Sequence, residues 1–450
     1  MEPGSKNNST IKDFILFLVL VGLPSNVFGM VDPEWFYMPG FFDFRMIFIL
    51  FCALLSIFMI FRWRMILQLP AGALLFVIAF YVIVQFIFSS FQLGFTDAFT
   101  VFRYYCLPIV AIGPLLYVLS LSRERQVRLI QWVFIATVVQ GTFFILHHLG
   151  FSIFYSPVYE VISFGEGEVQ RYSHAFPPYT LLVMNAALLF FLFQRQWHHA
   201  LYIIVLAAVI ILYATRSVII TAVFSMLLIL VLTMFKQGGK SLARIGIIIL
   251  FILMGCVLFI MVFPQYPEYV AERFLELTGT EGLQGSSNYN IRTLTVGIAV
   301  NDMATVKDML FGHGYEFRLL NDYMPGNFSR ELSMQGDAPI AGLLFTEGIL
   351  GVFLRALPFL ILLFIHLRLF LKSQNVEDII ISILVIVSIA GIGLGWLQTT
   401  ALRDLPFSLL PFVILHCLHS YSRQESVSLE GEANDAALYS MSVPDSEKNL

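Results

Sequence analysis

Residues 218–235 read VIITAVFSMLLILVLTMF, a run without a single charge, and Arg216 stands two positions before it. A helix rises about 1.5 Å per residue, so a run of this length crosses most of a hydrocarbon layer roughly 30 Å thick. The run therefore predicts a transmembrane helix, with a cation placed at its first turn.

The rest of the chain has the same character. Hydrophobic residues make up 58% of it, charged residues only 12%, and the mean hydropathy is +0.82. These values exclude a soluble globular protein and predict an all-α polytopic membrane protein. Apolar runs predict about twelve transmembrane helices, near residues 14–28, 46–61, 71–88, 104–121, 129–149, 179–193, 200–214, 218–235, 245–263, 348–367, 379–396 and 405–421.

Basic residues on alternate connections predict the orientation. Cytoplasmic loops carry an excess of Lys and Arg, and here the clusters are Arg62/Arg64, Arg123/Arg125/Arg128, Arg195, Lys236/Lys240/Arg244, Arg368/Lys372 and Arg423. Both termini are therefore expected in the cytoplasm. The outer face then receives connections 31–43, 92–99, 150–178, 215–217, 264–337 and 398–404.

Within a transmembrane domain of residues 1–423, the connection 264–337 is far too long for a tight turn. It also holds apolar residues at near-helical spacing, which predict short amphipathic helices along the membrane surface: Ile291, Leu294, Ile298, Val306, Met309 and Leu310. We expect this extracytoplasmic loop to carry the chemistry of the protein. The polar residues 424–450 predict a disordered cytoplasmic tail.

Outside the cytoplasmic clusters, the remaining basic residues are almost all arginine. Arginine binds phosphate oxygens through a planar fork, whereas lysine offers one mobile point charge. The bias therefore favours a phosphate-bearing ligand. The set is Arg45, Arg103, Arg171, Arg216, Arg273, Arg292, Lys307, Arg318, Arg330, Arg355 and Arg403.

Three of these arginines have competing interpretations. Arg216 lies in a tight hairpin between two apolar runs and is either functional or an interfacial anchor. Arg355 lies about seven residues inside an apolar run, where a lone charge costs at least a few kcal/mol. That depth favours a functional or ion-paired role over snorkelling. Arg103 lies at the end of its predicted helix, where snorkelling explains it equally well.

Several segments in order resemble the O-antigen polymerase and ligase superfamily. They are 171–179 (RYSHAFPPY), 215–220 (TRSVII), 290–294 (NIRTL), 308–315 (DMLFGHGY) and 337–351 (DAPIAGLLFTEGILG). The large loop late in a set of about twelve helices is also similar. Members of this family handle glycans carried on undecaprenyl pyrophosphate, so the resemblance implies that Arg171, Arg216 and Arg292 hold the diphosphate and glycan.

One departure from the family pattern bears on the reaction. Ligases that attach glycan to a lipid A core usually carry His where this chain has Asp337, which favours the polymerase interpretation. Asp337 is either a general base for an acceptor hydroxyl or the N-cap of the next helix. His313 and His174 stand in turns and are either substrate ligands or solvated residues.

The sequence thus leads to one hypothesis and two alternatives. The hypothesis is a polysaccharide polymerase of the cytoplasmic (inner) membrane that acts on undecaprenyl-pyrophosphate-linked oligosaccharide. A chain-length regulator is a candidate partner, and no nucleic acid is expected. The polymerase's expected catalytic residues are Asp337, Arg216 and Arg292, and its expected substrate-binding residues are Arg171, Arg355, His313 and Arg103. Arginines would neutralise the diphosphate, so no metal or cofactor is needed. The alternatives are a ligase and a polysaccharide or lipid transporter or flippase.

Overall fold

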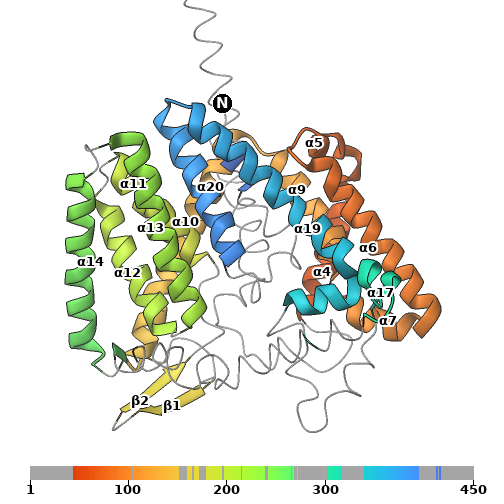
Figure 1. The fold of residues 1–450 in the computed structure, drawn as a ribbon, viewed down its shortest axis with the longest axis horizontal. Coiled ribbons are helices and arrows are strands. Elements are labelled where there is room, and N and C mark those ends of the chain that lie inside the picture. The colour runs from red at the N-terminus through yellow and green to blue at the C-terminus, as the bar shows by residue number, and fades with distance from the viewer. Residues whose placement is uncertain are drawn as a thin grey trace, which may run out of the picture.

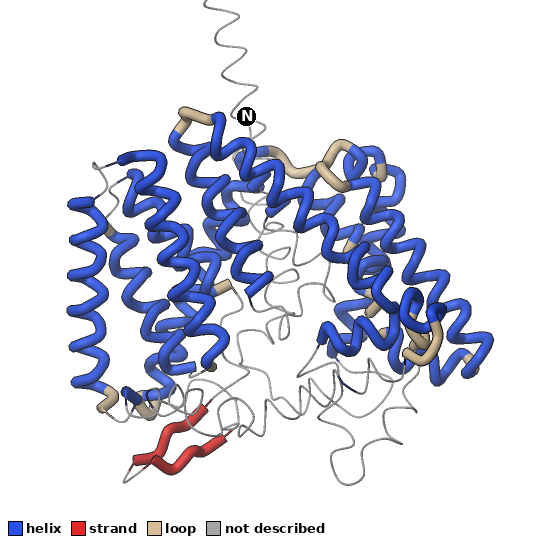
Figure 2. The backbone as a smooth tube through the Cα atoms, in the orientation of Figure 1, coloured by secondary structure: helices blue, strands red, loops and turns tan. Residues whose placement is uncertain are grey.

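The fold is described from a computed structural model. The description covers residues 44–394 and the pairs 412–413 and 415–416, with gaps at 104, 152–159, 165–166, 172–178, 195–196, 214, 239–241, 265, 268–270, 272–296, 298–302 and 316–338. The predicted span 14–28, nearly all of the span 405–421 and the tail 424–450 lie outside these residues. In the part described, helices stand side by side in one layered bundle (Figures 1 and 2).

The first part of the chain forms one group of helices (Figure 1, red to orange). Its elements are α4 (Phe44–Met59), the 3-10 helix η2 (Ile60–Arg62), α5 (Arg64–Leu67), α6 (Gly72–Leu93), α7 (Phe95–Phe102), α8 (Leu107–Val110) and α9 (Ile112–Leu119). Helix α4 packs on α8 and α9, and α6 packs on α7. Ser56 bridges the break between α8 and α9, donating to Val110 O at 2.7 Å and accepting from Gly113 N at 2.8 Å.

A second group follows in the chain and packs beside it. It comprises α10 (Arg123–His148), α11 (Thr180–Gln194), α12 (His198–Tyr213), α13 (Arg216–Gln237) and α14 (Leu242–Val262). Between α10 and α11 an antiparallel hairpin of β1 (Glu160–Phe164) and β2 (Gly167–Arg171) pairs Glu160 with Arg171. The sequence analysis did not predict this hairpin.

Two later helices join the groups. Helix α19 (Pro339–Lys372) packs on α6 and on α20 (Val376–Leu394), and α20 packs on α11 and α13. In the apolar stretch of α20, 56% is buried inside the protein, whereas only 19% of the corresponding stretch of α14 is buried. Helix α20 is therefore central and α14 peripheral. The short helix α17 (Val306–Phe311) packs on α19 at the same end of the bundle as the β1–β2 hairpin (Figure 1).

The helices indicate a multi-pass membrane protein. Six are long and apolar enough to cross a membrane, and four shorter apolar helices accompany them among the residues that can be described. Together these helices cover the ten predicted spans that fall within those residues. The expected total of about twelve spans stays a prediction.

Some boundaries differ from the sequence-based expectation. The predicted span 104–121 is two helices, α8 and α9, and the predicted connection 92–99 is mostly helix α7. The span expected to start at residue 348 is the second part of α19, which begins at Pro339 and is interrupted at Gly348. In the long loop, α17 confirms one of the predicted short amphipathic helices. Its first turn is fixed by a capping box in which Thr305 and Asp308 exchange hydrogen bonds.

Candidate functional site

The clearest polar feature inside the bundle is a buried ion pair on α19. Arg355 and Glu347 both have fully buried side chains. The Arg355 Nε donates to Glu347 Oε2 at 2.8 Å, its Nη2 donates to Oε1, and Nη2 also lies 3.4 Å from Tyr105 O. A lone charge at such a position is costly, so each member of the pair requires the other.

A break in α19 makes this pairing possible. Gly348 has φ 69° and ψ −173°, a conformation that only glycine adopts without strain, and it interrupts the helix immediately after Glu347. Gly351 and Arg355 are one turn apart in the helix after the break, and Glu347 lies against Gly351. At Gly351 a Cβ atom would lie 2.3 Å from Glu347 Cβ, so glycine there makes room for the carboxylate.

The turn that follows α17 fills the break. A helix interruption leaves carbonyl groups without their usual partners, and burying them unpaired is unfavourable. Here His313 N donates to Phe345 O at 2.8 Å and Gly314 N donates to Thr346 O at 3.0 Å. Gly312 has φ 70°, and a Cβ atom there would lie 2.6 Å from Phe345 O. The Gly-His-Gly sequence is therefore what lets the turn approach the helix backbone.

A polar stripe on α6 holds the same break from the other side. Tyr81 and Gln85 are one helical turn apart, and their side chains are hydrogen-bonded at 3.0 Å. The Tyr81 hydroxyl donates to Glu347 O at 2.6 Å, and Gln85 Nε2 donates to Phe311 O at 2.8 Å. The break in α19 and the end of α17 are thus both tied to α6.

Tyr315 completes the cluster and is fully buried. Its backbone N donates to Ser89 Oγ at 2.8 Å, and its hydroxyl donates to Glu347 Oε1 at 3.0 Å. Its ring packs against those of Phe102 and Tyr105, with centroids 5.4 and 5.8 Å away. Tyr315 therefore connects the ion pair to the segment that carries Arg103.

Three of the seven residues expected from the sequence gather around this cluster. Arg355 lies at its centre. Arg103 is the C-cap of α7, two residues before Tyr105, and is half-buried. His313 is also half-buried, and its ring centroid lies 5.0 Å from that of Phe345.

The other four expected residues are not brought to this cluster by any described contact. Arg171 is the last residue of β2 and Arg216 the first of α13, and for both the description is limited to the backbone. Arg292 and Asp337 lie outside the described residues. Their roles stay predictions.

For Arg355 the structure decides between the interpretations that the sequence left open. Its guanidinium is committed to Glu347 and is closed to solvent. Glu347 itself was not singled out from the sequence. The signal was present, because a carboxylate stands eight residues before an arginine in one apolar run, and a charge in such a run needs a partner.

Several polar side chains at this end are partly or fully exposed, among them Arg103, His313, Asp308 and Lys307. Arg103 and His313 are partly exposed, and Asp308 lies on α17 close to His313. The hydrogen bond from Thr305 lowers the pKa of Asp308, and His313 and Lys307 add smaller effects in the same direction. A guanidinium and an imidazole together can bind an anion such as a phosphate.

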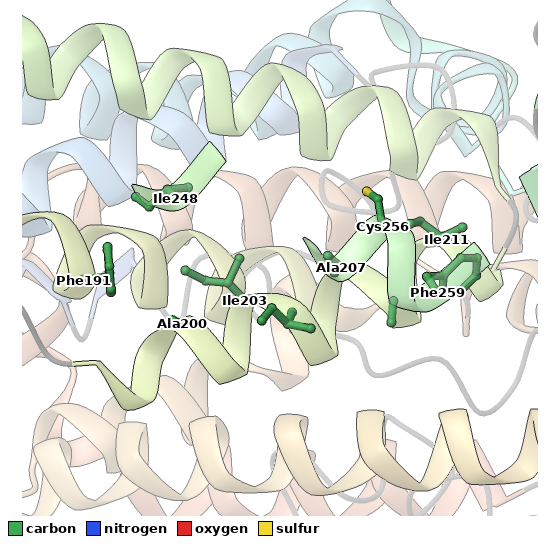
Figure 3. A pocket seen from close by; sticks show the side chains of 11 residues that line it. Phe191, Ala200, Ile203, Ala207, Ile211, Ile248, Cys256 and Phe259 are labelled. Atoms are coloured by element: carbon green, nitrogen blue, oxygen red, sulfur yellow. The ribbon is translucent and has the colours of Figure 1, made fainter. Parts of the chain in front are cut away.

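A pocket elsewhere in the bundle has no such groups. It lies between α12 and α14 and is lined by aliphatic, aromatic and small side chains, among them Ile203, Ala207, Ile248, Gly255 and Phe259 (Figure 3). None of its lining residues is charged. The pocket therefore offers apolar packing and no acid, base or cation, which makes the polar cluster at α19 the candidate site.

Within the described ranges no group of three or more His, Cys, Asp or Glu side chains is arranged to hold a metal ion. Comparison of the chain with protein-family models and with curated proteins finds no match to either.

Proposed function

We propose that this chain is a membrane glycosyltransferase of the polysaccharide polymerase class. It would transfer a growing glycan from undecaprenyl pyrophosphate to a lipid-linked repeat unit at the outer face of the inner membrane. The observation that carries the proposal is that part of the long loop is fixed to the membrane helices by buried hydrogen bonds, with His313 and Arg103 beside the contact. A transferase acting at the membrane surface needs such a fixed anion-binding rim over its lipid-borne substrate.

In this scheme the bond between the anomeric carbon of the donor glycan and its phosphate oxygen breaks. The phosphate oxygen keeps the electron pair, and undecaprenyl pyrophosphate leaves. The acceptor hydroxyl oxygen forms the new glycosidic bond, and its proton passes to the carboxylate of Asp337. Arg216 and Arg292 would neutralise the charge that grows on the leaving diphosphate, and Arg171 would hold donor phosphate or glycan.

Arg103 and His313 would bind the substrate at the rim, whereas Arg355 would act from inside. Its guanidinium is bonded to Glu347 and cannot reach a diphosphate without giving up that pair. We therefore remove Arg355 from the substrate-binding set and give it a supporting role.

The decisive experiment is complementation of a strain that lacks this chain. Arg216→Ala and Arg292→Ala should insert normally and lower polymer formation by roughly a hundredfold or more, the size typical for loss of one electrostatic stabiliser. Arg368→Ala is the matched control, because Arg368 is an exposed arginine near the last turn of α19. Wild-type chain lengths in both active-site variants would contradict the proposal.

The same glycan profile separates polymerase from ligase. Loss of a polymerase leaves single lipid-linked repeat units, whereas loss of a ligase leaves long lipid-linked polymer unattached.

A transporter or flippase is the second candidate, and the break in α19 favours it. Discontinuous helices with an intramembrane ion pair occur at the substrate sites of transporters. In this chain, however, the carbonyls freed at Phe345 and Thr346 are bonded to the turn at His313 and Gly314. Flipping of lipid-linked oligosaccharide by the purified chain in vesicles, without polymer formation, would favour the transporter.

A further inference from the structure

Glu347 is the point at which three distant segments of the chain meet. Its carboxylate accepts hydrogen bonds from Arg355, in the second half of α19, and from Tyr315, in the turn after α17. Its backbone oxygen accepts from Tyr81 on α6. Of these partners Tyr81 is 266 residues away in sequence and Tyr315 is 32 residues away.

We infer that Glu347 is a positioning residue: it fixes the turn 312–315 against α6 and α19, and through this turn it fixes His313 relative to Arg103. This inference rests on the proposed function only where polymer formation is measured; the docking of the turn is independent of it. Arg355 supports this role of Glu347, because it neutralises the carboxylate and holds both of its oxygens in place.

The backbone next to Glu347 is bonded directly to the turn. The two carbonyls just before it, at Phe345 and Thr346, receive the backbone N–H groups of His313 and Gly314. A movement of Glu347 therefore also moves the backbone of His313 and Gly314, which is hydrogen-bonded to these carbonyls. Tyr315 also restrains the segment that carries Arg103, since its ring packs on Phe102, the residue before Arg103.

The charged form of Glu347 is required for this role. A carboxylate has two oxygens that accept from Arg355 Nε, Arg355 Nη2 and the Tyr315 hydroxyl, whereas a glutamine offers one oxygen and adds a competing donor. Hydrogen bonds to charged groups are the stronger ones. We expect Glu347→Gln to shift the ratio of docked to undocked turn by about tenfold or more.

A disulfide reports whether the turn is docked. A Cβ atom built on Gly314 lies 3.5 Å from Ser89 Cβ, a separation that suits a disulfide. The purified full chain with Ser89→Cys and Gly314→Cys is oxidised, and the cross-linked fraction is measured over time by mass spectrometry of the joined peptides. Gly314 has φ 84°, so cysteine is strained there, and Ser89→Cys removes the hydroxyl that accepts from Tyr315 N. Both changes are common to every chain compared.

Three variants are made in this two-cysteine chain. Glu347→Gln and Tyr315→Phe should each slow cross-linking, and Tyr315→Phe keeps the ring contacts while losing only the hydroxyl bond to Glu347. Thr137→Val is the matched control, because its hydroxyl is buried and bonded within α10 at 2.7 Å from Val133 O. Equal cross-linking rates in all chains would overturn the inference.

Polymer formation then separates positioning from chemistry. Oxidation should restore activity to the Glu347→Gln chain, because a covalent tie replaces the lost anchor, and reduction should abolish it again. A cross-linked Glu347→Gln chain that stays inactive would overturn the inference, and so would loss of activity when the parent two-cysteine chain is oxidised. If the wild-type chain makes no polymer, the proposed function fails, and the cross-linking rates alone decide the role of Glu347.

Discussion

The buried pair between Arg355 and Glu347 allows a quantitative test of the fold. Removing one partner of a buried ion pair costs about 3–5 kcal/mol, because the remaining charge is left without compensation. We expect Arg355→Met alone and Glu347→Gln alone each to lower the free energy of unfolding by about this amount. The double variant should lose less than either single variant, because no uncompensated charge remains.

The free energies come from reversible denaturation in mixed micelles with increasing SDS, followed by circular dichroism of the helices. Arg368→Met is the matched control: Arg368 is exposed on the same helix, so its replacement should change stability by no more than about 0.5 kcal/mol. The reasoning is refuted if the costs of the two single variants simply add in the double variant, since independent sites behave in that way.

Two further predictions concern single positions. Gly351→Ala should cost about 1–3 kcal/mol in the same SDS assay, because the new Cβ would lie 2.3 Å from Glu347 Cβ, whereas Gly393→Ala, with no atom within 4 Å of its Cβ, should be neutral or stabilising. Equal effects at the two glycines would contradict this. The Asp308 pKa is lowered mainly by Thr305, so the capping of α17 is present at neutral pH and is lost as the pH falls through the folded-state pKa. Thr305→Ala should raise that pKa towards 3.8 in an NMR titration of the carboxyl group, and an unchanged pKa would show that another group holds it.

The apolar runs were sufficient to predict the described membrane-spanning helices, but not the short helix α7, which was assigned to a connection. Each described span was expected at nearly its correct position, because a long run without charges has few alternatives to a membrane-crossing helix. Helix α10 was expected to start at residue 129 but begins at Arg123. Charged residues in its first two turns hide the beginning of the helix. The β1–β2 hairpin was missed although Gly165-Glu166 between EVISF and GEVQR is a hairpin signal, because the whole segment was assigned to a connection between membrane spans.

The candidate site was predicted only in part. The depth of Arg355 in its apolar run indicated a paired or functional arginine, and the Gly-His-Gly turn was noted. A helix start was predicted at Gly348, but the helix before it was not, so the break was not recognised as one. Positive φ is invisible in a sequence, and glycine is also common in unbroken membrane helices. The polar stripe of Tyr81 and Gln85 could have been found from its four-residue spacing within an apolar run. Its partners could not, because they depend on contacts between distant segments.

The stripe on α6 has a consequence for how the protein is made. Gln85 leaves the ribosome 226 residues before Phe311, the partner of its side chain. At about 5–20 residues per second, translation separates the two by roughly 11–45 s. During that interval α6 lies in the bilayer with polar side chains that lack their final partners. The nascent chain therefore passes through a stage at which the stripe on α6 must be accommodated by lipid, water or other helices, before the turn after α17 is made.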